Sequence, residues 1–262
     1  MKAIKLITLT IVLSMLTACT YIPEKQTINN DSLLMATLYQ QKSAEVEALC
    51  YQAYNIAELR LNQILENNPY KKPLAIVVDV DETVLDNSPF EAKSILENSD
   101  YPTYWKEWME LANAKALPGA VEFLNYASSK GVETFYITNR KVEFHDATMK
   151  NLKDKGFPHV DEAHIMLRST ESNKEARRQK VLETHEIVLL MGDNLNDFTD
   201  LFEANSIAER HQNVIDLKAE FGKKFIILPN ATYGAWMDAL MNYENLPKEE
   251  KLKKLKEGLE GF

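Results

Sequence analysis

The stretch Ala75-Ile76-Val77-Val78-Asp79-Val80-Asp81-Glu82-Thr83 sets the interpretation of the whole chain. Its first four residues are apolar and mostly β-branched, which predicts a short strand buried on both faces of a parallel sheet. Asp79 and Asp81 follow two residues apart, so in an extended backbone their side chains point to the same side. Open α/β sheets bind ligands at this edge, and a divalent cation would relieve the repulsion between the two carboxylates. The alternative is a polar strand end whose acids have no function.

Composition limits the classes of protein to consider. With 262 residues and 45% hydrophobic content, the chain can bury one sizeable core, which favours one domain with an appended helical subregion. The formal net charge of −9 argues against binding to a nucleic acid polymer, because such binding depends on Lys and Arg that neutralise phosphates. A small phosphorylated ligand is still compatible, since a bound metal supplies positive charge locally.

The first thirty residues are predicted to lie outside the folded domain. A short basic segment at 1–5 and an apolar run at 6–18 are typical of a signal peptide, and the run is short for a membrane span. It ends in Leu16-Thr17-Ala18-Cys19, which resembles the lipobox of bacterial lipoproteins. We therefore expect a signal peptide at 1–18, a lipid on Cys19, a tether at 19–30 and an extracytoplasmic protein anchored to a bacterial membrane. The alternative is an ordinary secretory signal with a chance Cys.

Residues 31–262 alternate between helical and extended patterns. One long helix is predicted from Asp31 or Ser32 to about Asn67, and a charged surface helix over about 247–262. Strands alternating with helices indicate an α/β fold, with a doubly wound parallel sheet and a small helical subregion at about 31–68 and 87–117. Strands are predicted at 74–78, 132–138, 164–167, 187–191 and 224–228, with helices between them at 120–130, 143–155 and 174–184.

Reactive side chains stand at the predicted ends of three strands: Asp79, Asp81, Thr138 and Asp193. The carboxyl ends of parallel strands share one edge of a sheet, so we expect these residues to meet there. Asp197, four residues after Asp193, adds another acid. Several carboxylates around one point need a hard cation, and Mg²⁺ fits best. Lys174, at the start of a predicted helix, would place an ammonium opposite these acids, where a helix N-terminus also favours anions.

Four ordered segments resemble the motifs of the haloacid dehalogenase (HAD)-type phosphohydrolases: Asp79-Val80-Asp81-Glu82-Thr83, Ile137-Thr138-Asn139-Arg140, Lys174 and Gly192-Asp193-Asn194-Leu195-Asn196-Asp197. More narrowly, the chain resembles the bacterial class C acid phosphatases, the outer-surface lipoprotein 5′-nucleotidases. This resemblance extends over about residues 16–240 and includes the lipobox, segments 43–45 and 51–54, and the turn at 117–120. It implies a HAD-like Rossmann-type core with a small helical cap.

The resemblance also implies a two-step phosphoryl transfer. Asp79 would attack phosphorus and form an aspartyl-phosphate. Asp81 would protonate the leaving oxygen and then deprotonate the water that hydrolyses the intermediate. Thr138 and Lys174 would hold the non-bridging phosphoryl oxygens. From the residues alone, Lys180, Arg177 or Arg178 would also serve as the source of positive charge.

A metal site is implied in the same way. Mg²⁺ would be bound by the Asp79 carboxylate, the Asp81 backbone carbonyl and Asp193, with Asp197 acting indirectly through water.

The non-phosphate part of the substrate is open on the sequence alone. Trp105 lies in the insertion after the first motif, and Tyr233 follows the last strand. Two facing aromatic rings would stack a nucleobase, whereas a pocket without them would accept smaller phosphomonoesters. Asn139 would either contact phosphate or shape its loop. The alternative for Trp105 and for Trp108 in the same insertion is that they form the core of the helical subregion.

These observations predict a lipid-anchored, Mg²⁺-dependent acid phosphatase that hydrolyses phosphomonoesters, with nucleoside 5′-monophosphates as the expected substrates. One alternative is a broad-specificity phosphatase or phosphotransferase without base preference. Another is a surface lipoprotein that binds a ligand without catalysis, against which the intact Asp79-to-Thr83 motif argues. A homodimer is left open.

Overall fold

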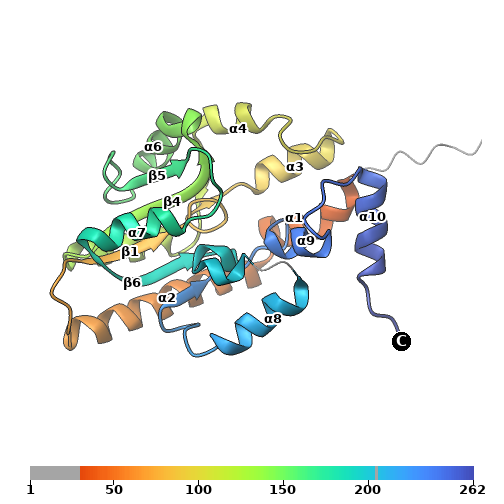
Figure 1. Cartoon of the computed structure of the whole chain (residues 1–262). Helices are drawn as coiled ribbons and strands as arrows, with labels where there is room; N and C mark the ends of the chain where they lie inside the picture. The colour runs from red at the N-terminus through yellow and green to blue at the C-terminus, as the bar shows by residue number, and fades with distance from the viewer. Residues whose placement is uncertain (1–29, 204–205) are drawn as a thin grey trace, which may run out of the picture.

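The computed structural model of the chain describes residues 30–203 and 206–262 (Figure 1). The predicted signal peptide at 1–18, Cys19 and all but the last residue of the tether lie outside the described residues, so they stay predictions. Within the described ranges, no helix combines the length and the apolar character that a bilayer crossing requires.

Five parallel strands form the central sheet, in the order β5-β4-β1-β6-β7. The central strand β1 is flanked by β4 and β6, with Val77 opposite Phe135 on one side and Leu190 on the other. The predicted strands are all present, and β4 continues past its expected end at 138. The strands are β1 (Leu74–Val78), β4 (Glu133–Lys141), β5 (Ile165–Arg168), β6 (Glu186–Gly192) and β7 (Phe225–Ile227).

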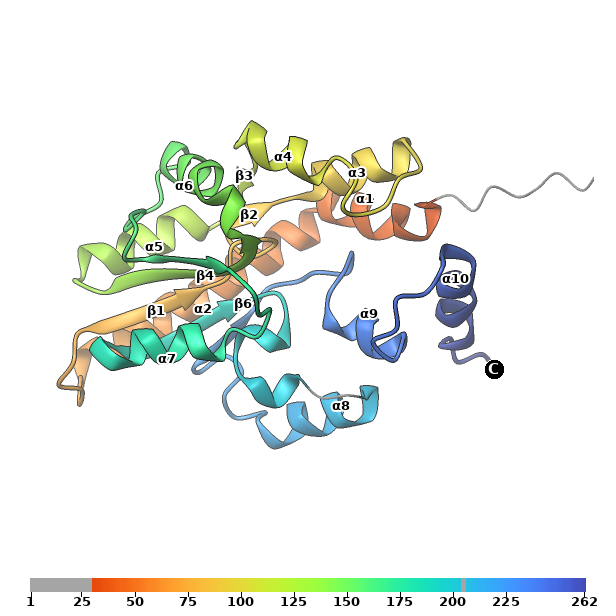
Figure 2. The same cartoon turned by 45° about the horizontal axis from the view of Figure 1, so that its top comes forward.

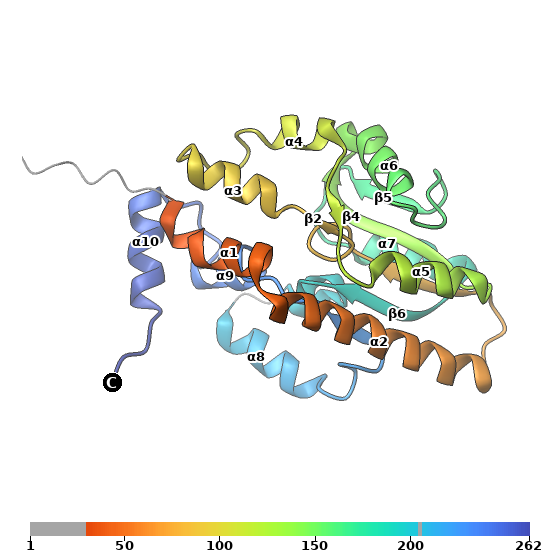
Figure 3. The same ribbon diagram turned by 180° about the vertical axis from the view of Figure 1, so that it is seen from behind.

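The two faces of the sheet belong to two separate apolar cores. Leu74, Ile76 and Val78 of β1 pack in one core with α2 (Ala44–Glu66), α5 (Ala120–Ser129) and α6 (His145–Asp154). Ala75 and Val77 pack in the other core, with α7 (Glu175–Thr184). Figure 1 shows α7 over one face, and the reverse view in Figure 3 shows α2 and α5 over the other. Side chains alternate along a strand, so β1 supplies both cores, and the predicted doubly wound α/β fold is confirmed.

The long helix expected from residue 31 or 32 to 67 is interrupted at Ser43. A short 3₁₀ turn (Asn30–Leu33) and α1 (Leu34–Lys42) precede this residue, and α2 follows it. Ser43 is extended, with φ −82° and ψ 126°, and its hydroxyl accepts a hydrogen bond of 3.1 Å from the Glu45 N–H. This is an N-cap, and it satisfies a backbone donor that would otherwise be free at the start of α2. The prediction of one continuous helix is therefore wrong.

The helical subregion expected at 31–68 and 87–117 contains elements with different neighbours. Helix α1 packs against α3 (Ser88–Leu96), and α4 (Trp105–Leu111) packs against α6, as Figure 2 shows above the sheet. Helix α2 packs instead on the sheet and on α5. Two short antiparallel strands, β2 (Leu85–Asp86) and β3 (Lys115–Ala116), pair at the two ends of the segment that carries α3 and α4. This segment leaves the core immediately after the first sequence motif and returns at β3.

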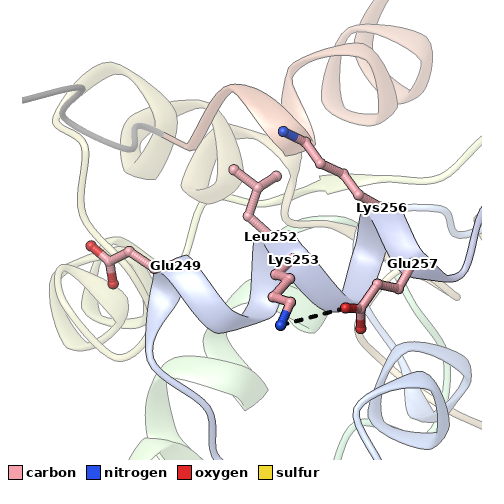
Figure 4. Close-up of a pocket in the computed structure, with 5 residues that line it drawn as sticks. All are labelled: Glu249, Leu252, Lys253, Lys256 and Glu257. Atoms are coloured by element: carbon pink, nitrogen blue, oxygen red, sulfur yellow. Dashed lines mark ion pairs between the residues drawn. The ribbon is translucent and has the colours of Figure 1, made fainter.

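The C-terminal elements extend away from the sheet. After β6 come the 3₁₀ turns η3 (Leu195–Asp197) and η4 (Asp200–Phe202), then α8 (Ile207–Asp216), β7, α9 (Ala235–Leu240) and α10 (Lys248–Glu257). Helix α10 has no buried residue, as expected for the charged tail, and Lys248 at its start donates to the Asn98 side chain at 2.7 Å. Figure 4 shows a surface hollow along α10, where Lys253 and Glu257 pair at 3.6 Å and Leu252 is the only apolar side chain drawn.

Candidate active site

The carboxyl ends of the central strands bring together residues that are far apart in the sequence. Asp79 directly follows β1, and its backbone N–H bonds to the Met191 carbonyl of β6 at 2.9 Å. Asp193 follows the end of β6. Thr138 belongs to β4 and lies beyond the last β1–β4 pair, Val78 opposite Tyr136. The parallel register therefore places all three residues at one edge of the sheet.

Three carboxylates converge at this edge. One oxygen from each of Asp79, Asp193 and Asp197 lies within 4.8 Å of the others. The side chain of Lys174, the N-cap residue of α7, forms ion pairs with Asp79 and with Asp197, the latter at 2.7 Å from Nζ to Oδ1. Three acids against one ammonium leave an excess of negative charge in a buried place. A hard cation with oxygen ligands fits such a donor set.

The electrostatics of the cluster follow from this imbalance. Burial, together with the nearby charges of Asp197 and Asp81, raises the pKa of Asp79 to about 7, although Lys174 acts in the opposite direction. Burial also raises the pKa of Asp193 well above its ordinary value, and Asp197 adds to the rise. Burial opposes the charge of Lys174, but Asp197 and Asp79 outweigh it and raise the pKa of the ammonium group. Lys174 is therefore charged, and the acids still lack positive charge.

Asp197 takes its place through a close approach to Gly192. Its Oδ2 accepts the Asn194 N–H at 3.0 Å, which closes the capping box of η3. A Cβ on Gly192 would lie 2.3 Å from that oxygen and 2.4 Å from the Asp197 Cβ. Because atoms that are not bonded to each other cannot lie this close, only glycine at position 192 allows Asp197 to lie beside the other two acids.

Asp193 is oriented by two side chains that the sequence analysis did not single out. Its Oδ2 accepts from Asn230 Nδ2 at 2.8 Å, and its Oδ1 accepts from Thr83 Oγ1 at 3.2 Å. Thr83 is the last residue of the first motif, and Asn230 follows β7. Partners of this kind fix the direction in which a metal-binding carboxylate points.

Asp81 lies in a separate environment with partners of its own. Arg140 donates to its Oδ1 from Nε at 2.9 Å and from Nη2 at 2.8 Å. Asn87 Nδ2 donates to the same oxygen at 2.5 Å. The Asp81 side chain is 17% exposed, whereas that of Arg140 is 2% exposed. The two aspartates that stand two apart in the sequence therefore have different cations and different neighbours.

Thr138 and Asn139 are held in place from β4 and α7. Thr138 is fully buried, and its hydroxyl accepts from the Arg140 N–H at 3.1 Å, which leaves the hydroxyl proton free to be donated. Arg177 donates to the Thr138 carbonyl at 2.5 Å and to Asn139 Oδ1 at 2.7 Å. Asn139 itself is exposed, and its bond to Arg177 fits the role of shaping the loop.

The structure selects Lys174 among the cations that the sequence left open. Arg177 is bound to backbone carbonyls and Asn139, as described above. Arg178 donates to the Asp197 carbonyl at 3.0 Å and pairs with Glu175 at 2.7 Å. Lys180 is exposed. Of these four residues, Lys174 alone forms ion pairs with the acidic cluster.

The aromatic candidates do not form a pair of facing rings. Trp105 makes edge contacts with Phe90 at 4.9 Å and Tyr101 at 5.8 Å between ring centroids. The Tyr233 hydroxyl donates to the carboxylate of Glu82. Among the described residues, no ring contact joins Trp105 to Tyr233, so a role of these two residues in base stacking stays a prediction.

Glu82 and Asn87 are two further residues near the site that the sequence analysis missed. Their side chains are almost completely buried, with 2% and 1% of each residue exposed. Glu82 also has a left-handed backbone, with φ 54°, which a residue of this type rarely adopts. A third acid directly after Asp81 was a visible signal, but nothing in the sequence indicated its partners.

Comparisons with known proteins agree with this geometry. A family model described as HAD superfamily, subfamily IIIB (acid phosphatase) matches residues 8–236. The class C acid phosphatase from Bacillus anthracis is 46% identical, with a TM-score of 0.87 over 89% of this chain and 98% of that chain. A structure of that protein with tungstate bound matches with 46% identity and a TM-score of 0.87 over 90% of this chain and 99% of that one.

More distant curated relatives match over a shorter region. The stem 31 kDa glycoprotein of Glycine max is 27% identical over 128 residues, which are 46% of this chain and 50% of the relative. The stem 28 kDa glycoprotein of the same plant is 29% identical over 130 residues, 46% of this chain and 51% of the relative. The match thus spans about half the length of these curated relatives. Because the family model covers most of the chain and the structural match covers 89% of it, the chain belongs to HAD superfamily subfamily IIIB, a family of acid phosphatases that hydrolyse phosphomonoesters.

Proposed function

We propose that the protein is a Mg²⁺-dependent phosphomonoesterase that works through an aspartyl-phosphate on Asp79. The observation that supports this proposal most directly is that the two aspartates of the first motif lie in different surroundings. Asp79 lies among Lys174 and two further acids, whereas the Asp81 carboxylate is bound by Arg140 and Asn87. A nucleophile beside an ammonium and a separate acid with its own support are what a two-step transfer requires.

In the first step, an oxygen of Asp79 attacks phosphorus and the bond from phosphorus to the leaving oxygen breaks. Asp81 gives its proton to that oxygen. The Lys174 ammonium and the hydroxyl of Thr138 lie at the same sheet edge and would neutralise the charge on the non-bridging oxygens. In the second step, Asp81 takes a proton from water, which attacks phosphorus and releases Asp79.

The acidic cluster fits a divalent cation, which the carboxylates of Asp79 and Asp193 and the Asp81 carbonyl would bind, with Asp197 acting indirectly through water. Bound there, Mg²⁺ would offset the repulsion between the incoming phosphate and the acids. The choice of Mg²⁺ rests on the all-oxygen donor set. Asn230 and Thr83 would keep Asp193 directed at the ion.

The substrate proposal rests on the charge of the expected ligand and on the anion bound in the structure of a relative. Tungstate, which is bound in the structure of the Bacillus anthracis enzyme, is a tetrahedral oxyanion like phosphate. Nucleoside 5′-monophosphates are the proposed substrates, with Trp105 and Tyr233 as the candidates for contact with the base. The lipobox at Cys19 supports an extracytoplasmic, lipid-anchored location, where removal of phosphate would allow uptake of the nucleoside.

The test is phosphate release from nucleoside 5′-monophosphates with Mg²⁺ and with a chelator. Wild type should be active with Mg²⁺ and inactive with chelator, and Asp79→Asn should lose about 10⁴-fold or more, the scale seen when a nucleophile is removed. Asp146→Asn is a control, because the Asp146 side chain is fully exposed and outside the cluster. Full activity of Asp79→Asn would overturn the mechanism.

A broad phosphatase without base preference is a second candidate, because Trp105 packs on Phe90 and Tyr101 and makes no ring contact with Tyr233 within the described ranges. Comparison of kcat/KM for a nucleotide and for glycerol 2-phosphate separates the two. A base-binding site predicts a clear preference for the nucleotide that Trp105→Ala or Tyr233→Ala weakens. Equal values for both substrates would favour the broad phosphatase.

A further inference from the structure

Asn87 is buried between the catalytic aspartate and the inserted helices. Its Nδ2 donates to Asp81 Oδ1 at 2.5 Å, and its Oδ1 accepts from Trp108 Nε1 at 2.8 Å. An indole N–H can only donate, so Trp108 determines which end of the amide is the oxygen. The amide nitrogen must then face Asp81. Trp108 belongs to α4, so the inserted helices set the orientation of a side chain that reaches the catalytic acid.

The backbone of Asn87 is fixed as well. Its N–H donates to Glu82 Oε1 at 2.7 Å. Glu82 is itself held in the left-handed turn after Asp81, and its carboxylate also accepts from the Tyr233 hydroxyl. A buried side chain whose neighbours are all bonded cannot change rotamer without leaving polar groups unpaired. Asn87 therefore gives Asp81 a rigid partner.

Both donors to Asp81 reach the same oxygen. Arg140 and Asn87 bond to Oδ1, and within the described residues no hydrogen bond reaches Oδ2. A carboxylic acid carries its proton on the oxygen that is not already occupied by donors. The arrangement thus leaves Oδ2 as the oxygen that gives and takes the proton.

We propose that Asn87 is a positioning residue: together with Arg140 it holds Asp81 so that Oδ2 faces the leaving oxygen, and Trp108 of α4 holds Asn87 in turn. This inference rests on the proposed function, because it concerns the proton transfer by Asp81. In that step the bond from phosphorus to the leaving oxygen breaks, the Oδ2–H bond breaks and a new O–H bond forms on the leaving group.

The proposal predicts an effect that depends on the leaving group. An alkoxide is too basic to leave without a proton, whereas p-nitrophenolate is a stable anion and leaves without one. Because kcat/KM reports the steps up to phosphorylation of the enzyme, it isolates this first proton transfer. A misplaced Asp81 should therefore lower kcat/KM for an alkyl phosphate and leave kcat/KM for an aryl phosphate almost unchanged.

The experiment measures kcat/KM for glycerol 2-phosphate and for p-nitrophenyl phosphate in wild type, Asn87→Ala and Trp108→Phe. For Asn87→Ala we expect about a 10- to 100-fold loss with glycerol 2-phosphate and less than about 3-fold with p-nitrophenyl phosphate, since a general acid contributes about 10²–10⁴-fold. Trp108→Phe removes only the indole donor and keeps most of the ring volume, so a smaller but equally selective loss is expected from a folded protein.

Asn151→Ala is the matched control. Asn151 is also a buried asparagine, 2% exposed, and its amide bonds to the backbone N–H and carbonyl of Ala114, both at 2.9 Å. A purely structural defect should lower kcat/KM for both substrates by the same factor, and this is the result expected for Asn151→Ala. If Asn87→Ala and Trp108→Phe each lower kcat/KM for both substrates by the same factor, the positioning role is overturned.

Asp81→Ala separates this inference from the proposed function. If Asp81→Ala shows the selective loss and the Asn87 and Trp108 variants do not, only the positioning role fails. If Asp81→Ala itself affects both esters equally, the proposed role of Asp81 as general acid fails, and the positioning role with it.

Discussion

Charged side chains gather at both ends of the central sheet, and the two clusters differ in how their charge is balanced. At the carboxyl end, Asp79, Asp193 and Asp197 face one ammonium, that of Lys174. At the amino end, Glu133 at the start of β4 bonds to two imidazoles. His164 Nε2 lies 2.8 Å and His185 Nε2 3.2 Å from its Oε2.

The amino-end cluster needs no ion from outside. His164 also bonds to Asp161, through Nδ1 at 2.7 Å, so two carboxylates meet two imidazole rings in this cluster. The carboxyl-end cluster has more acids than cations and is more deeply buried. Of the residues that the structure describes, only the three aspartates at this end form a group able to hold a metal. An unbalanced buried charge is thus what distinguishes the candidate site from a structural ion-pair network.

Removal of Lys174 should have the largest effect on the carboxyl-end cluster. In Lys174→Met the buried acids lose their counter-charge and phosphate loses a ligand, so kcat should fall by about 10³-fold. The metal-free protein should also lose about 3–5 kcal/mol of unfolding free energy, as when one partner of a buried pair is removed. Steady-state kinetics and urea unfolding with chelator test both effects, and a Lys174→Met protein as stable and active as wild type would contradict the account.

Metal binding should stabilise the carboxyl-end cluster and not the amino-end one. At about 100 times its dissociation constant, Mg²⁺ should add about 2.7 kcal/mol to the unfolding free energy of wild type. Asp193→Asn should lose most of this gain, whereas Asp161→Asn should keep it. Thermal unfolding with Mg²⁺ and with chelator measures the difference, and the comparison fails if both variants respond alike.

Gly192→Ala should disturb the same cluster without changing any charge. The new methyl group would meet Asp197 and push its carboxylate away from Asp79 and Asp193. We expect affinity for Mg²⁺ to fall by about 10- to 100-fold, the usual cost of misplacing a supporting group. Calorimetric titration with Mg²⁺ checks this, with Gly131→Ala as the control, because a Cβ there would meet no atom within 4 Å; unlike Gly192, Gly131 has a positive φ, so this control also carries backbone strain. Unchanged affinity in Gly192→Ala would show that Asp197 is not needed at the ion.

The smallest expected effect is a pH dependence of stability at the amino end. Burial acts to lower the pKa of His164, but bonds to Asp161 and Glu133 outweigh it and raise the pKa above its ordinary 6.5. The contribution of protonated His164 to the unfolding free energy is therefore complete below pH 6.5, and it is lost as the pH rises through the folded-state pKa. The bond to His164 lowers the pKa of Glu133 below its ordinary 4.5, so that contribution is present above 4.5 and is lost as pH falls through the folded-state value.

His164→Gln tests this window. The stability difference between wild type and His164→Gln should be larger by about 0.5 kcal/mol at pH 5.5 than at pH 8.5, on the scale of a partly exposed ion pair. Urea unfolding at the two pH values measures it. A difference that grows with rising pH would contradict the assignment of charges to this cluster.

Much of the carboxyl end could be predicted because it follows from local patterns. Short apolar runs followed by Asp79, Thr138 and Asp193 identify the strands, although β4 continues to Lys141, and parallel strands bring their carboxyl ends to one edge. The sequence also placed Lys174 at the start of a helix, which the structure confirms. Ser43 could have been recognised in the same way, because a Ser followed closely by Glu45 is a common start of a helix.

The rest depended on contacts between distant parts of the chain. Arg140 reaches Asp81 across 59 residues, and Tyr233 reaches Glu82 across 151. No period or spacing records such pairs, since Arg140 reaches Asp81 only when β4 lies beside β1, and Tyr233 reaches Glu82 only when the loop after β7 folds over the strand end. For the same reason, the sequence named Trp105 and Tyr233 as candidates to stack one base, whereas the structure shows only that Trp105 contacts Phe90 and Tyr101.

The most direct test of the account is to trap the covalent intermediate. In Asp81→Asn, p-nitrophenyl phosphate should still phosphorylate the enzyme because its leaving group needs no proton, but hydrolysis should be slow because the base is missing. Acid quenching during turnover followed by peptide mass spectrometry should then find one phosphoryl group on Asp79. A phosphoryl group on another residue, or none while Asp81→Asn still releases p-nitrophenol in an initial burst, would contradict the assignment of Asp79 as the nucleophile.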